Sequence, residues 1–207
     1  MRRLFSTVIA LMAFAFCLSA QTADEIVARM DTEIEKGETQ GLAMTMSMKI
    51  PLVGEFSTRI KSLGDFSRAD ADVKGEKVIF WNDQKTSWTY TASKNEIVIE
   101  NSKSSKNNEE ADLVKGITSG YDVSLKSETD NTWTLKCVKS KSNQEKDDPK
   151  TLDLVVSKKT YLPVRLNAKV KMVGITLSDF AVGVSPSEVK FDPSAYKDAT
   201  ITDKRGQ

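Results

Sequence analysis

The chain has 207 residues, almost equal numbers of basic and acidic side chains, a formal net charge of +1 and no histidine. A net charge this small gives little reason to expect nucleic acid or an anionic membrane as the partner. The lack of histidine removes the commonest metal ligand and the commonest general base. We therefore expect a protein that is not an enzyme and needs no cofactor.

Residues 1–20 have the pattern of a secretory signal peptide. Two arginines follow the first methionine, an apolar run extends from Val8 to Leu18, and small residues end at Ala20. The run is too short to span a bilayer as a stable helix. We expect cleavage near Ala20 and one exported domain over 21–207, with a lipid anchor on Cys17 as the less favoured alternative.

The first element expected after the signal is an amphipathic helix over 23–36. Thr22 and Glu25 have the spacing of a capping box, in which each side chain accepts a hydrogen bond from a free backbone N–H group. Apolar residues then recur every four positions, and Gly37 is the expected stop. The apolar stripe of this helix consists of Ile26, Met30 and Ile34.

From Gly41 onward the apolar residues recur with a period of two, which predicts strands. The expected strands cover 44–50, 55–63, 77–81, 86–91, 96–100, 121–127, 132–139, 151–157, 163–173 and 175–184. Gly174 is the expected turn between the last two, and residues 109–115 are expected to form a short helix. The fold class is therefore mainly β with α (α+β), as a strongly curved sheet or partly closed barrel of ten or eleven antiparallel strands.

The candidate catalytic or metal-binding residues are few. Asp65, Asp70 and Asp72 cluster near one strand end, and Asp147 and Asp148 are adjacent in another segment. Paired carboxylates serve acid–base chemistry or Ca²⁺ binding, but we interpret these as solvated loop charges. Cys137 is the single cysteine left after signal cleavage, so no internal disulfide is expected. We interpret it as a buried packing residue.

A row of methionines is the most informative feature. Met44, Met46 and Met48 lie on one face of an expected strand. Methionine fills irregular space and specifies shape poorly, as suits a pocket that admits acyl chains of varied length. A second apolar face comprises Leu166, Ala168, Val170 and Met172. We hypothesise that both faces line one apolar cavity, which the N-terminal helix covers as a lid; an ordinary filled core is the alternative.

Three stretches with the exported start and the first helix resemble the periplasmic outer-membrane lipoprotein carriers, the LolA-like family. They are VIFWNDQKTSWTY at 78–90, the pair YLPVRL at 161–166 and ITLSDF at 175–180, and FDPSAYKDATITD at 191–203. The resemblance implies an incomplete β-barrel with a helical lid around an apolar cavity. It also implies a periplasmic carrier in a Gram-negative bacterium, whose partners are acylated lipoproteins, an inner-membrane export complex and an outer-membrane acceptor.

The resemblance and the apolar pattern together give a set of candidate site residues in a protein that we expect to be a monomer. The candidate lid residues are Ile26, Met30 and Ile34. The candidate cavity residues are Met44, Met46, Met48, Ile50, Phe80, Trp88, Tyr90, Leu166, Val170 and Met172.

One position departs from the family pattern. Well-studied carriers have an arginine on an early strand that ties the lid shut, and Ser62 stands there in this chain, beside Lys61. Arg59 and Arg68 are the nearest candidates for a lid latch. Two other functions stay open: a periplasmic interaction or envelope-stress sensing module on the same fold, and an envelope hydrolase, which the lack of histidine disfavours.

Overall fold

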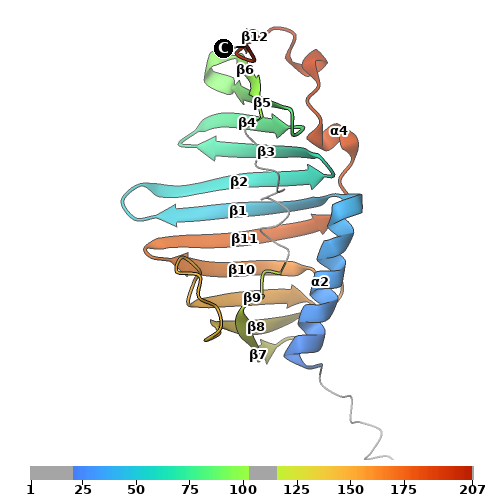
Figure 1. The fold of residues 1–207 in the computed structure, drawn as a ribbon, viewed down its shortest axis with the longest axis vertical. Coiled ribbons are helices and arrows are strands. Elements are labelled where there is room, and N and C mark those ends of the chain that lie inside the picture. Colours follow the sequence, from blue (N-terminus) through green and yellow to red (C-terminus); the bar gives the residue numbers. More distant parts are fainter. Residues whose placement is uncertain (1–20, 103–115, 207) are drawn as a thin grey trace, which may run out of the picture.

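The computed structural model describes residues 21–102 and 116–206, in which one long helix packs on a twelve-stranded sheet (Figure 1). The expected signal peptide and the expected helix over 109–115 lie outside the described residues. The helices are α2 (Ala23–Gln40) and the single turn α4 (Pro186–Val189). The strands are β1 (Leu42–Ile50), β2 (Gly54–Leu63), β3 (Phe66–Val73), β4 (Glu76–Asn82), β5 (Thr86–Thr91), β6 (Glu96–Asn101), β7 (Tyr121–Glu128), β8 (Thr132–Lys139), β9 (Thr151–Ser157), β10 (Pro163–Val170), β11 (Val173–Val182) and β12 (Thr200–Asp203).

The strands lie in the order β12-β6-β5-β4-β3-β2-β1-β11-β10-β9-β8-β7, so β12 and β7 form the two edges of an open sheet. Every neighbouring pair is antiparallel except β12 and β6. The α+β class with an N-terminal helix is confirmed. The expected number of ten or eleven strands was too low, because β3 and β12 are additional.

Helix α2 begins as the sequence predicts and ends later. The Thr22 hydroxyl accepts a hydrogen bond from the Glu25 N–H, and the Glu25 carboxylate accepts one from the Thr22 N–H. Gly37, the expected stop, lies inside the helix, where a Cβ atom would come within 2.9 Å of the Leu42 Cβ. Gly41 ends the helix instead, with its N–H donating to the Gly37 carbonyl.

Strand β3 was not predicted from the sequence, because charged side chains interrupt its apolar pattern. The Arg68 guanidinium forms two hydrogen bonds to the Asp70 carboxylate, of 2.7 and 2.9 Å, and both side chains are partly buried. The interpretation of Asp70 as a solvated loop charge was therefore wrong. Asp72 ends the strand region by accepting a hydrogen bond from the Gly75 N–H, and Asp65 accepts one from Gln84.

The turn between β10 and β11 comes earlier than expected. Lys171 and Met172 form it, with Lys171 at φ 55°. Gly174 lies within β11, where it is paired with Lys49 on one side and Lys169 on the other. The glycine is therefore a strand residue and not the turn, and a Cβ there would make only ordinary contact with Lys49, 3.7 Å away.

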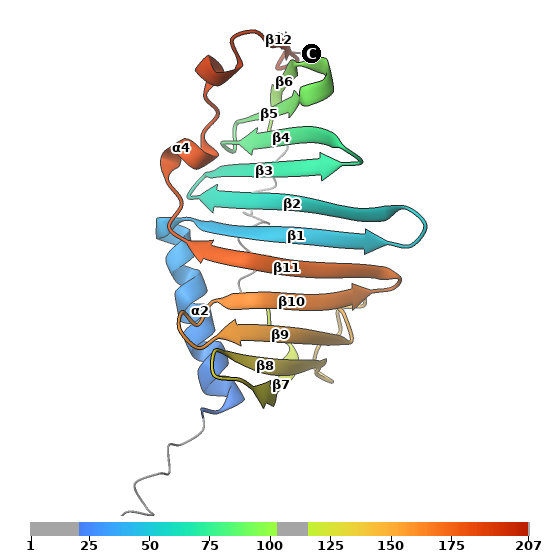
Figure 2. The ribbon, with the colours of Figure 1, turned by 180° about the vertical axis from the view of Figure 1, so that it is seen from behind.

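Two layers of chain cover opposite faces of the sheet. The register aligns Met44 with Ile60, Ile60 with Ala69 and Ala69 with Phe80, so these residues share one face, which we call the methionine face. Helix α2 packs on this face along one end of β11 to β7 (Figures 1 and 2). The core beneath it consists of Ile26, Met30, Ile34, Leu42, Met44, Ile60, Trp133, Leu135, Cys137, Leu152, Leu154, Val156, Leu166 and Leu177.

The opposite face is covered by residues 183–203, which we call the C-terminal strap, over β2 to β6. Val189 and Val184 of the strap pack with Ala43 in a second, smaller core. The strap then ends as β12, which pairs with β6 and extends the sheet. We call this side of the sheet the strap face.

Candidate functional site

The methionine row begins under helix α2 and continues past it. Met44 is 2% exposed and packs with Met30, whereas Met46, Met48 and Ile50 are half-buried. The row therefore passes from a closed core to a surface that helix α2 only partly covers. The sequence prediction that these residues share one face is confirmed by the register of β1 with β2 and β11.

Two further candidate cavity residues, Leu166 and Val170 of strand β10, lie on the same face as this row. Leu166 pairs with Leu177, which pairs with Met46, and Val170 lies two positions further along the same face as Ala168. Phe80 lies on the same face in β4 and is 45% exposed. The partly exposed apolar residues of the methionine face include Met46, Met48, Ile50, Phe56, Ala71, Val78, Phe80, Ala168, Val170 and Ile175.

Charged side chains are segregated between the faces of the central strands. On the methionine face, the described positions of β1, β2, β3, β10 and β11 carry no Asp, Glu, Lys or Arg. The same strands place Lys49, Arg59, Lys61, Arg68 and Asp70 on the strap face. An apolar, uncharged sheet surface of this extent is typical of a site that binds an apolar partner.

Trp88 and Tyr90 do not belong to this surface, and their assignment to the methionine cavity was wrong. Trp88 pairs with Trp81, and Tyr90 pairs with Ile79. Because both partners are next to Phe80 in β4, they lie on the opposite face, and the two rings point to the strap face. Trp88 stacks on Phe191 of the strap, with ring centroids 5.3 Å apart, and Tyr90 lies 4.7 Å from Tyr196. These rings hold the strap on the sheet.

Met172 was also wrongly assigned. It lies in the turn between β10 and β11 and is 72% exposed, because the strand ends three residues earlier than expected.

A small cleft lies between the strap and the sheet. Its volume is about 170 Å³, and its lining residues are Phe66, Trp81, Asn82, Asp83, Trp88, Val189, Lys190 and Phe191. The strand residues Phe66, Trp81 and Trp88 line this cleft, and their side chains point to the strap face. The cleft is therefore separate from the methionine row.

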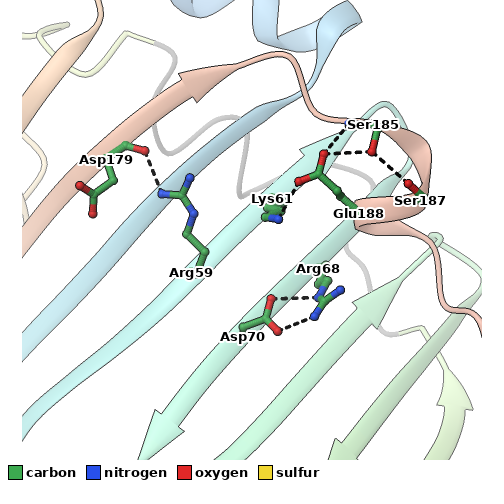
Figure 3. A network of polar contacts seen from close by, with 8 residues as sticks. All are labelled: Arg59, Lys61, Arg68, Asp70, Asp179, Ser185, Ser187 and Glu188. Atoms are coloured by element: carbon green, nitrogen blue, oxygen red, sulfur yellow. Dashed lines mark hydrogen bonds and ion pairs between the residues drawn. The ribbon is translucent and has the colours of Figure 1, made fainter. Parts of the chain in front are cut away.

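The two candidate latch arginines lie on the strap face, so neither ties down helix α2 (Figure 3). Arg59 donates to the Asp179 carbonyl at 2.8 Å, where β11 has an irregular register, and to the Thr45 hydroxyl. Arg68 pairs with Asp70 and lies over the Trp81 ring. Both arginines are close to Ser62 in the sequence, but the alternation of the strands directs their side chains away from the helix.

The strap has its own latch. The Lys61 ammonium forms a 2.8 Å ion pair with Glu188 in α4, and Glu188 also accepts hydrogen bonds from the Ser185 N–H and hydroxyl (Figure 3). The hydrogen bond from Lys61 is the main cause that lowers the pKa of Glu188 to about 2. Ser62, at the family's arginine position, lies beside Leu42 on the methionine face.

The residue that does tie down helix α2 is Tyr161, which the sequence reasoning did not assign. Arg29 donates to the Tyr161 hydroxyl at 2.9 Å, Gln21 donates at 3.2 Å, and the Arg29 guanidinium lies 5.1 Å from the ring centroid. Tyr161 packs on Trp133 and adopts φ 56°, a strained conformation for a residue other than glycine. The one hint of this role in the sequence is that Tyr161 directly follows the turn expected at 158–160.

Helix α2 also carries one poorly satisfied group. The Asp31 Oδ1 is buried and has no hydrogen-bond partner. Burial, and secondly the nearby Glu35, raises the pKa of Asp31. A buried carboxylate oxygen without a donor is unfavourable for the folded state.

The described residues show no cluster placed to hold a metal ion. Cys137 is fully buried in the main core, and burial, with a smaller contribution from Asp153, raises the pKa of its thiol to about 11. Its interpretation as a packing residue is confirmed. Across 21–102 and 116–206, no three carboxylate or thiol side chains are placed to hold a metal ion. Within the same ranges, no helix is long and apolar enough to cross a membrane.

No protein-family model matches the sequence, and no curated protein sequence matches it. Among solved structures, the chain is similar to an uncharacterized conserved protein from Thermus thermophilus, at 17% identity and a TM-score of 0.47 over 88% of this chain and 99% of that one. A LolA superfamily protein from Nitrosomonas europaea is similar at 12% identity and a TM-score of 0.37, over 84% and 100%.

The complex of MucA and MucB from Pseudomonas aeruginosa includes a chain that is similar at 10% identity and a TM-score of 0.44, over 82% of this chain and 61% of that one. A LolA superfamily protein is thus among the similar structures, as the resemblance of the sequence led us to expect.

Proposed function

We propose that this protein is a periplasmic carrier that holds the acyl chains of lipoproteins against its methionine face and catalyses no covalent step. The observation that carries the proposal is a half-buried, uncharged apolar surface that continues from a closed core under helix α2. The resemblance to lipoprotein carriers supports the same class of ligand. The signal-like residues 1–20 support export to the periplasm.

The chemistry of the surface suits a ligand that must be taken up and released. Each methylene moved from water to this surface contributes about 0.8 kcal/mol. Met46 and Met48 adapt their side chains to chains of different length because the thioether side chain is unbranched and flexible. No charged or strongly polar side chain on the central strands fixes the ligand in one orientation, so binding is adaptable and of modest strength.

Helix α2 supplies the lid in this proposal. Its apolar stripe of Ile26, Met30 and Ile34 covers the closed end of the methionine row. The Tyr161 cluster holds the start of the helix, and the buried Asp31 carboxylate opposes tight packing. A helix held at its ends and destabilised in its middle is suited to shift and uncover more of the row when an acyl chain enters.

The test compares a fluorescent acylated peptide with its unacylated twin, using the purified exported chain. We expect the acylated peptide to bind with clear preference. Met46→Asp places a charge in the middle of the apolar row and should reduce acyl binding by about a hundredfold, since burial of an unpaired carboxylate costs several kcal/mol.

The matched control is Ser47→Asp, which adds the same charge to the neighbouring residue of the same strand on the opposite face. We expect it to bind the acylated peptide as the unchanged protein does. Equal binding of the two peptides by the unchanged protein would contradict the carrier function and favour the interaction or sensing module.

A further inference from the structure

Exposed apolar side chains gather at one end of the sheet. The hairpin between β1 and β2 extends beyond the neighbouring strands (Figures 1 and 2). At its tip Leu52 is 109% exposed and Val53 is 50% exposed, and Leu52 adopts φ 65°. A large apolar side chain that lies completely in water contributes nothing to the core, and several such side chains gathered in one patch are typical of an interaction site.

Other turns bring apolar side chains to the same end. Met172, 72% exposed, lies in the turn between β10 and β11, and Val73, 43% exposed, lies at the end of β3. The register places both residues at the end of the sheet that carries the hairpin tip, because Lys49 of β1 pairs with Gly174 of β11, and Ser57 of β2 pairs with Asp72 of β3. We call Leu52, Val53, Val73 and Met172 the apolar tip.

We propose that the apolar tip docks on the surface of a lipid bilayer, so that acyl chains pass between the membrane and the methionine face. This inference rests on the proposed function. The row Met46, Met48 and Ile50 leads along β1 directly to Leu52, whereas the other end of the row is closed by helix α2. A chain that enters from the tip therefore follows apolar surface along β1, and its exposure to water stays low.

The charges around the apolar tip are mixed. Lys49, Lys169 and Lys171 are exposed there, and so are Glu55 and Asp147, which forms an exposed 3.2 Å ion pair with Lys171. Such a pair contributes little to association. The insertion of apolar side chains is therefore the main driving force, and the docking should persist on vesicles of zwitterionic phosphatidylcholine and strengthen only slightly when phosphatidylglycerol is added.

The experiment measures flotation of the purified exported chain with phosphatidylcholine vesicles, with and without phosphatidylglycerol. The variant carries Leu52→Asp and Met172→Asp, and Asp tolerates the left-handed conformation of residue 52. We expect the bound fraction to fall by about tenfold or more, as expected when one buried leucine side chain is lost from the contact. The control is Ile201→Asp, at a residue that is 57% exposed on the distant strand β12 and should leave flotation unchanged.

Acyl-peptide binding in solution, measured on the same variants, separates this inference from the proposed function. Tip-dependent flotation supports the docking surface, and it does so even if the preference for acylated peptide is absent and the carrier function fails. Absence of flotation by the unchanged chain would overturn the docking surface while leaving acyl binding intact. Equal flotation by the unchanged chain and the double variant would overturn it as well.

Discussion

At the scale of single residues, the junction between helix α2 and strand β1 depends on one glycine. Gly41 has φ 83°, a region that favours glycine, and an added Cβ would lie 2.6 Å from the Val184 Cβ and 2.9 Å from the Ser62 carbonyl oxygen. The residue therefore lies where helix α2, strand β1 and the start of the strap approach one another closely. Its lack of a side chain fixes how closely these three segments approach.

Gly41→Ala is expected to destabilise the protein more than Gly75→Ala does. Both glycines have φ 83°, but a Cβ at Gly75 meets nothing within 4 Å, whereas at Gly41 the clash with Val184 adds to the backbone strain of φ 83° with ψ 145°. We expect the difference in unfolding free energy to be about 1–3 kcal/mol, as for other overpacked sites. Urea denaturation of both variants measures it, and equal values would show that the junction can relax without loss.

At the scale of elements, the C-terminal strap holds its place through rings and one ion pair. Phe191 and Tyr196 pack on Trp81, Trp88 and Tyr90, and the Lys61–Glu188 pair fixes α4 beside β2. The apolar part of this contact does not depend on pH, but the ion pair does. The strap is therefore the element whose attachment should respond to acid.

The pKa of Glu188 is lowered from its ordinary value of 4.5 to about 2. The ionised carboxylate therefore makes its full contribution to strap attachment at any pH above 4.5. The contribution is lost as the pH falls from 4.5 through 2. Glu188→Gln should remove it at every pH, so the two proteins should differ in tryptophan emission at pH 7 and converge near pH 2. A pH-independent difference would contradict this role of the ion pair.

At the scale of the whole molecule, one continuous sheet carries two cores on opposite faces. The larger core lies under helix α2 across β1 and β11 to β8, and the smaller one lies under the strap near β1 to β3. Because the larger core holds most of the fully buried side chains, the two ends of the sheet should differ in local stability.

Hydrogen exchange should resolve this difference. We expect the backbone amides of β8, β9 and β10, which carry Leu135, Leu154 and Leu166 into the main core, to exchange slowest. The amides of β6 and the four-residue edge strand β12 should exchange faster, since the strap can detach without opening the main core. Mass spectrometry of the exchanged protein measures both, and uniform protection across the sheet would contradict two separable cores.

The sequence alone determined the local features of this fold. The capping box of Thr22 and Glu25, the four-residue spacing of Ile26, Met30 and Ile34, and the alternation in β1 all depend on residues close together in the chain, and the structure confirms them. Strands without charged interruptions were also located to within a few residues. Strand β3 was missed because Arg68 and Asp70 satisfy each other in the folded sheet, which composition cannot reveal.

The tertiary structure decided which residues meet. Alternation divides each strand into two sets of side chains, but only the long-range register decides which sets share a face, and a shift by one residue exchanges them. Phe80 thus joins the methionine face while Trp88 and Tyr90 point to the strap, and Arg59 and Arg68 point away from helix α2. The site is a property of strand pairing between segments more than a hundred residues apart, such as Met46 with Leu177, and short-range patterns carry no information on that pairing.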